Sequence, residues 1–153
     1  MKNYFRILSI IILVLVADIA TKHFLFDVEY FNLIPKVISI ASNGGNTGAA
    51  FGMFSGNTTG LIIVSSLMIV ALLVFDCFVK NKHFLYSLSF GLIVGGALGN
   101  LYDRVRYGYV RDFIFLDFAP NFPVFNVADS CLCVGAVLMV VYILFVQNKK
   151  NEK

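Results

Sequence analysis

The sequence predicts an all-α integral membrane protein with four transmembrane helices and a small strand-rich lobe between the first two. Hydrophobic residues make up 59% of the 153 residues and charged residues 14%, whereas a soluble domain carries about 25% charged residues. Four apolar runs are each long enough to cross the roughly 30 Å hydrocarbon layer of a bilayer. The length fits one domain, residues 1–153.

The first span is expected over residues 4–26. It follows Lys2 and Arg6 as a signal peptide would, but no small-residue cleavage site follows it. Asp18 and Lys22 break its apolar character near the far end, and their spacing of four places them on one helical face. We expect a local ion pair with a structural role, in preference to a chemical one.

Residues 27–58 have a different composition. Residues 28–40 are rich in β-branched and aromatic side chains, and residues 41–56 are rich in glycine and asparagine. This pattern predicts short strands and tight turns at the membrane surface. The stretch 46–52 contains Gly48 and Gly52, which either let the backbone approach a ligand closely or form a plain turn. Taken alone, the stretch favours the plain turn.

The other three spans are expected at about 59–78, 84–101 and 130–147. Glycines at 91, 95, 96 and 99 would let neighbouring helices pack closely against the third span. That span leads into Asn100, Asp103 and Arg104. Asn100 and Arg104 share one face if the helix continues.

The charge distribution predicts the orientation of the chain. Four spans place both termini on one side, together with seven of the 12 Lys and Arg residues and two of the nine acids. The other side carries five basic and seven acidic residues. The positive-inside rule therefore places both termini in the cytoplasm and the polar motifs on the outer face.

Asp112 and Asp129 each lie at the edge of a hydrophobic segment, where a lone carboxylate is expensive to bury. Two carboxylates held close together cannot both ionise easily, so one keeps a proton near neutral pH. This is the working state of an aspartic dyad. The alternative is that Asp129 caps the last helix and Asp112 caps a short surface helix.

The sequence argues against other chemistries. A net charge of +3 without a Lys/Arg tract gives no reason to expect nucleic acid as a partner. Cys131 and Cys133 lack a second ligand pair, and the chain has only two histidines. We therefore expect no metal and no cofactor, and we interpret these cysteines and Cys77 as buried small hydrophobic residues.

Five motifs in order, spanning nearly the whole chain, resemble those of bacterial lipoprotein signal peptidase, also called signal peptidase II. Each motif is weak alone, but the ordered set is highly specific. The motifs are Asp18-x-x-Thr21-Lys22, Asn46-x-Gly48-Ala49-Ala50-Phe51-Gly52, Gly95-Gly96-Ala97-x-Gly99-Asn100-x-x-Asp103-Arg104, Val110-x-Asp112-Phe113-Ile114 and Phe125-Asn126-x-Ala128-Asp129-Ser130. Arg111 departs from the pattern, which has an apolar residue there.

The resemblance implies an aspartic endopeptidase of the inner or plasma membrane that cleaves prolipoproteins just before a lipobox cysteine carrying diacylglycerol. It further implies membrane lipid as a partner and a site for globomycin-type cyclic peptide inhibitors. The implied fold adds a small extracytoplasmic β-cradle, which we place at 27–58, and a short amphipathic helix, which we place within 105–118. The implied roles are a catalytic dyad of Asp112 and Asp129, substrate binding by Asn46, Gly48, Asn100, Arg104 and Asn126, and structural support from Asp18, Lys22 and Asp103.

The residues themselves suit this chemistry, because carboxylates are the catalysts on offer and we expect no serine or cysteine nucleophile with a histidine partner. One ionised aspartate would activate water while the other protonates the scissile carbonyl. A small membrane transporter or proton relay is the main alternative, but it predicts acids deep within the spans. A purely structural subunit would leave the outer cluster of Asp and Asn residues unexplained.

Overall fold

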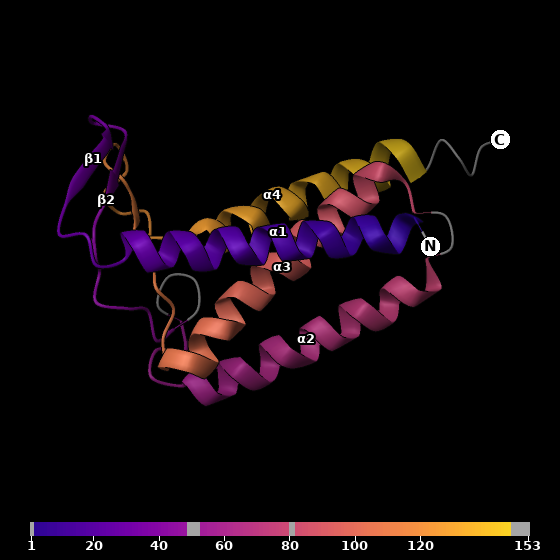
Figure 1. Cartoon of the computed structure of the whole chain (residues 1–153), viewed down its shortest axis with the longest axis horizontal. Helices are drawn as coiled ribbons and strands as arrows, with labels where there is room; N and C mark the ends of the chain where they lie inside the picture. The colour runs from indigo at the N-terminus through magenta and orange to yellow at the C-terminus, as the bar shows by residue number, and fades with distance from the viewer. Residues whose placement is uncertain (1, 49–52, 80–81, 148–153) are drawn as a thin grey trace.

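The computed structural model describes residues 2–48, 53–79 and 82–147. Four helices in this part of the chain are long and apolar enough to cross a membrane, as predicted. They are α1 (Lys2–Leu25), α2 (Thr58–Phe78), α3 (Phe84–Tyr107) and α4 (Val127–Val141), the last continued by the π-helical turn η2 (Tyr142–Gln147). The start of α1 and the end of η2 lie at the same end of the bundle (Figure 1).

Helix α3 packs against each of the other three helices. Its glycines make the close packing possible, as the sequence suggested. A Cβ on Gly95 would lie 2.8 Å from the Val14 side chain of α1, and one on Gly96 would lie 2.5 Å from the backbone oxygen of Ala128 in α4. Real Cβ contacts are longer than this. At these two positions α1 and α4 can lie so close to α3 only because α3 has glycine there.

Helix α3 continues to Tyr107, six residues past the end of the expected span, so Asn100 and Arg104 do share one face. It ends at Gly108, whose φ of 82° is left-handed and whose N–H donates to Arg104 O at 3.1 Å. A glycine in this conformation is a common helix stop.

A three-stranded antiparallel sheet lies at the end of the bundle opposite Lys2 (Figure 1). Its strands are β1 (Phe31–Ile34), β2 (Ile38–Ile40) and β3 (Ile114–Leu116), in the order β1-β2-β3. The register pairs Ile38 with Leu116 and Ile40 with Ile114. The β-cradle expected at 27–58 is thus completed by a strand from much later in the chain.

The prediction of a short surface helix within 105–118 is wrong. Residues 105–107 belong to α3, and 114–116 form β3. Between them, Val110 exchanges two backbone hydrogen bonds of 2.8 Å with Asn46. The backbone groups that a helix would need are therefore used in pairing with the cradle. In the expected close-approach stretch 46–52, residues 49–52 lie outside the described residues.

Candidate active site

Asp112 lies between the backbone bridge at Val110 and strand β3, with 2% of its surface exposed. Both of its carboxylate oxygens accept hydrogen bonds from asparagine side chains. Asn46 Nδ2 donates to Oδ2 at 2.9 Å, and Asn126 Nδ2 donates to Oδ1 at 2.7 Å. Because the backbone of Asn46 is paired with Val110, the cradle positions this amide directly against the carboxylate.

Asp129 lies in the first turn of α4, where Asn126 is the N-cap. Asn126 Oδ1 accepts the Asp129 N–H at 2.9 Å, and Asp129 Oδ2 accepts the Asn126 N–H at 3.2 Å. This reciprocal arrangement is a capping box. The interpretation of Asp129 as a helix cap is therefore correct, but the other oxygen, Oδ1, accepts a bond from Asn100 Nδ2 at 2.7 Å.

The three asparagine amides are held in one orientation by their oxygens. Asn46 Oδ1 accepts the Gly48 N–H at 2.9 Å, and Asn126 Oδ1 caps α4. Asn100 Oδ1 accepts from Lys22 Nζ and from Asn126 Nδ2, both at 3.1 Å. Each amide must then turn its NH₂ group toward a carboxylate. Asn126 joins the two halves of the site, since it bonds to Asp112 directly and to Asp129 through the cap.

Asp18, Lys22 and Asp103 lie behind these amides, and all three are fully buried. Lys22 Nζ is 2.8 Å from Asp18 Oδ2 and 3.3 Å from Asp103 Oδ2, so the predicted i,i+4 ion pair is present. Asp18 Oδ1 accepts the Ala128 N–H at 2.9 Å. The ion pair thereby joins α1 to α3 and to the first turn of α4.

The environment of Asp112 raises its pKa to about 6. Burial is the largest cause and the nearby Asp129 carboxylate the second, while the hydrogen bonds from Asn46 and Asn126 act in the opposite direction. The protonated form of Asp112 is therefore well populated just below neutral pH, as the dyad hypothesis requires.

Asp112 and Asp129 line one cavity of about 750 Å³. Of the predicted binding residues, Asn46, Asn100 and Arg104 also line it, whereas Gly48 and Asn126 are not among its walls. Gly48 instead accepts a bond from Arg104 Nη2 through its backbone oxygen at 2.9 Å. The cavity also has walls to which the sequence reasoning gave no role in the site, which are Asn43, Val110, Leu116, residues 122–125, Ser130, Leu132 and Cys133. The apolar segment around Pro123 was the available signal in the sequence.

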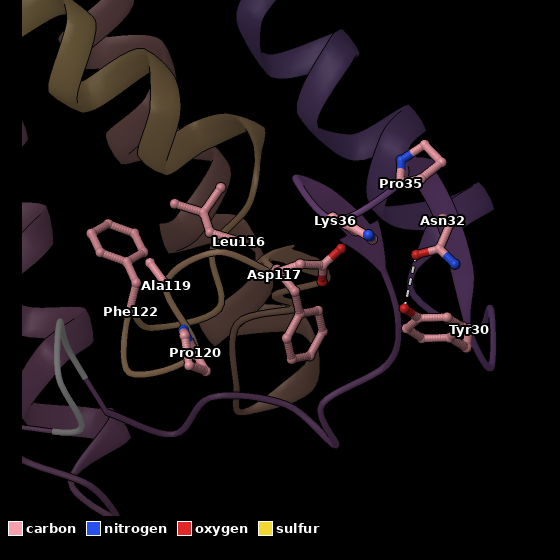
Figure 2. A pocket seen from close by; sticks show the side chains of 10 residues that line it. Tyr30, Asn32, Pro35, Lys36, Leu116, Asp117, Ala119, Pro120 and Phe122 are labelled. Atoms are coloured by element: carbon pink, nitrogen blue, oxygen red, sulfur yellow. Dashed lines mark hydrogen bonds between the residues drawn. The ribbon is translucent and has the colours of Figure 1, made fainter.

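A second hollow of about 640 Å³ lies on the cradle (Figure 2). Polar residues line much of it, including Tyr30, Asn32, Lys36 and Asp117, with the Tyr30 hydroxyl 2.8 Å from Asn32 Oδ1. None of the predicted site residues lines it. Leu116 and Phe122 line both hollows, so the two hollows are adjacent.

Within the described ranges, no group of three or more His, Cys, Asp or Glu residues is placed to hold a metal ion. The cysteines are not buried in the protein as expected. Cys77 and Cys133 are exposed and Cys131 is half-buried. They lie on helices of the membrane-spanning bundle, where an apolar side chain can face lipid instead of a protein core.

Four membrane-spanning helices with two aspartates in one largely apolar cavity define a class of protein, the membrane-embedded aspartic peptidases. The comparisons with known proteins identify the family. Residues 10–145 match the model of a peptidase family described as signal peptidase (SPase) II. The chain belongs to the signal peptidase II family and is a peptidase, and the family implies the aspartic type.

Relatives and solved structures agree with this assignment. A lipoprotein signal peptidase of Staphylococcus aureus strain MRSA252 is 37% identical over 161 residues, covering 99% of this chain and 97% of the relative. One of Clostridium acetobutylicum is 43% identical over 110 residues, 71% of each chain. A bacterial membrane enzyme solved by the in meso method at 2.3 Å is 34% identical with a TM-score of 0.81, covering 96% of this chain and 91% of the other. The transporter alternative is not favoured.

Proposed function

We propose that this protein removes the signal peptide from prolipoproteins whose lipobox cysteine carries diacylglycerol, cleaving just before that cysteine, with Asp112 and Asp129 as the catalytic dyad. One observation carries the proposal. Two carboxylates from different elements line the same cavity and are both held by asparagine amides.

The geometry supports a mechanism without a covalent enzyme intermediate. One carboxylate is ionised and takes a proton from a water molecule, which attacks the scissile carbonyl. The other carboxylic acid donates its proton to the carbonyl oxygen, giving a gem-diol that collapses as the amide nitrogen is protonated. Burial and mutual repulsion favour the singly protonated pair, which is the state that this mechanism needs.

The walls of the cavity suit a lipid-modified substrate. Leu132 and Cys133 come from α4, a membrane-spanning helix, and Cys133 is exposed on its surface. Acyl chains attached to the lipobox cysteine could therefore lie along α4 while the peptide bond reaches the dyad. Arg104 and Asn46 would bind the substrate backbone at the polar end of the cavity.

The hollow on the cradle (Figure 2) gives a path for the mature part of the lipoprotein. It shares Leu116 and Phe122 with the dyad cavity and lies on the sheet, beyond the ends of the helices. Its polar lining suits a chain segment that leaves the membrane surface. We propose that residues after the lipidated cysteine pass over it.

The mechanism requires the dyad to face the outer side of the inner or plasma membrane, because the substrate is lipidated there. The charge distribution along the sequence supports this orientation, with both termini in the cytoplasm. Globomycin-type cyclic peptides would then reach the cavity from outside and inhibit by occupying the dyad.

The test is cleavage of a diacylglyceryl-modified prolipoprotein by the purified protein in detergent. We expect the wild type to shorten the lipidated substrate but not the same preprotein lacking the lipid. Asp112→Asn and Asp129→Asn should each abolish turnover while leaving the thermal unfolding midpoint within a few degrees of wild type. Near-normal turnover by either folded variant would remove that residue from the dyad.

A further inference from the structure

Arg111 lies between α3 and β3 in the connection that leads to Asp112, and it is 7% exposed. Its guanidinium is spread over both oxygens of Asp103. Nη2 lies 2.8 Å from Oδ1, and Nε lies 3.3 Å from each oxygen. The face of the guanidinium covers the Tyr107 ring, with Cζ 4.4 Å from the ring centroid. Such a bidentate, stacked geometry is specific to arginine.

Asp103 is shared between two cations, Arg111 and Lys22. Lys22 is also bonded to Asp18 at 2.8 Å and to Asn100 Oδ1 at 3.1 Å. Arg111 already compensates the charge of Asp103. Lys22 Nζ can therefore stay at the longer distance of 3.3 Å from Asp103 Oδ2. Lys22 therefore remains placed to hold Asn100, whose NH₂ group is bonded to Asp129.

The formal charges near the dyad balance in one protonation state. We define the inner charge cluster as the ionisable residues that line the dyad cavity or are ion-paired behind it. Its members are the acids Asp18, Asp103, Asp112 and Asp129 and the bases Lys22, Arg104 and Arg111. With both dyad carboxylates ionised the cluster carries one net negative charge, and with one proton on the dyad it is neutral.

We infer that Arg111 is a positioning residue that sets the pH range of cleavage, by compensating Asp103 so that the dyad holds one proton and Lys22 stays on Asn100. This inference rests on the proposed function. Without the Arg111 charge, the singly protonated dyad would belong to a cluster with one uncompensated negative charge. A second proton would then bind the dyad more readily, and Asp103 would compete with Asn100 for Lys22.

Titratable groups from three helices form this cluster or face it. From α1 these are Asp18 and Lys22, from α3 Asp103, Arg104 and Tyr107, and from α4 Asp129 and Cys131. Arg106, which is exposed, also lies over the Tyr107 ring, with Cζ 5.7 Å from the ring centroid. Asp117 lies on the cradle and accepts a bond from Ser39 Oγ. Arg111 is the cation of the set that pairs with Asp103 from outside the helices.

The experiment compares pH profiles of kcat/KM for cleavage of the lipidated prolipoprotein. Arg111→Gln should move both limbs of the profile upward by about half a unit to one unit, the effect of losing one charge at an effective dielectric constant of about 20. The Arg111 N–H that bonds Asp103 at 3.0 Å survives the substitution, so the loop should keep its course. Arg111→Lys should restore most of the wild-type profile.

Two further variants separate charge from structure. Arg106→Gln removes the same charge from an exposed side chain over the same Tyr107 ring and should leave the profile unchanged. Adding Asp103→Asn to Arg111→Gln removes both charges of the pair and should bring the limbs back toward wild type. A folded Arg111→Gln protein with unshifted limbs would overturn the inference, whatever its kcat.

A readout independent of activity is the pH titration of the ¹³C-labelled Asp112 carboxylate by NMR. Its midpoint should be higher in Arg111→Gln than in wild type and Arg106→Gln. If the wild type failed to cleave at any pH, the proposed function would fall, while this titration would still test the effect of Arg111 on the dyad. An unchanged midpoint would refute that effect independently of the enzyme assay.

Discussion

Asn126→Ser separates the two tasks of the residue at the centre of the site. Serine caps a helix about as well as asparagine, so the start of α4 should persist. What is lost is the amide NH₂ group that donates to Asp112 at 2.7 Å and to Asn100 Oδ1 at 3.1 Å. The substitution therefore removes a donor to the dyad without removing the cap.

The size of the expected pKa change follows from the fact that the Asn126 donor stabilises the ionised form of Asp112. A hydrogen bond to a charged group contributes about 1.5–3 kcal/mol, and about 1.4 kcal/mol corresponds to one pKa unit. Asn46 still donates to the other oxygen of Asp112, and water in the cavity can replace part of the lost bond. We therefore expect the lower end, a rise of about one unit in the pKa of Asp112.

The assay is the pH dependence of kcat/KM on the lipidated substrate. Because the donor favours the ionised form, its loss raises the pKa of Asp112. The limb of the profile that is set by Asp112, near pH 6, should therefore move to higher pH. Asn57→Ser is the matched control. Asn57 caps α2, accepting the Gly60 N–H at 3.1 Å, and does not line the dyad cavity.

Asn126→Ala isolates the cap. Its pH profile of kcat/KM should be shifted as in Asn126→Ser. It should unfold at a lower temperature than Asn126→Ser, because losing an N-cap costs about 1 kcal/mol. If Asn126→Ser kept both limbs of the wild-type pH profile, the donor would have no role in setting the protonation of Asp112.

Three further perturbations test the frame of the site. Lys22→Met leaves buried Asp18 and Asp103 without their ammonium partner, so the free energy of unfolding in detergent should fall by about 3–5 kcal/mol; an unchanged unfolding curve would count against a buried ion pair. Gly96→Leu should separate α3 from α4 and lower both the unfolding midpoint and turnover, because even a Cβ would lie 2.5 Å from a backbone oxygen of α4. In a background without native cysteines, Glu29→Cys should react with an impermeant thiol reagent outside intact spheroplasts and His83→Cys should not; the reverse pattern would contradict the proposed orientation.

The sequence was sufficient for the spans because each apolar run is long and bounded by polar residues. It was less informative at their ends. Helix α3 continues to Tyr107 because Asp103 and Arg104 are compatible with a helix, and Gly108 marks the stop. Helix α4 begins at Val127, three residues before the expected span, because its N-cap is Asn126. Polar helix turns that are buried in a site cannot be recognised by hydropathy.

The dyad could be suspected from composition, since two acids in apolar surroundings need a reason. The bonds from the asparagines to the carboxylates could not, because each NH₂ group donates to an acid that is distant in sequence, such as Asp112 for Asn46. The pairing of β2 with β3 was also out of reach, since a three-residue strand carries too little pattern to predict a distant partner. The sequence showed Arg111 only as a departure from the expected motif. The fold shows that Arg111 pairs with Asp103.

If Asp112 and Asp129 form the proposed dyad, the capping box at α4 links catalytic competence to the order of synthesis. Asp112 emerges from the ribosome before Asn126, and until α4 docks against α3 it lacks one of its two amide donors and its partner carboxylate. A partly inserted chain thus contains all of the first three helices but no dyad. Proteolytic capacity would then arise only when the last helix is in place, so a nascent copy could not cleave neighbouring membrane segments while it is still folding.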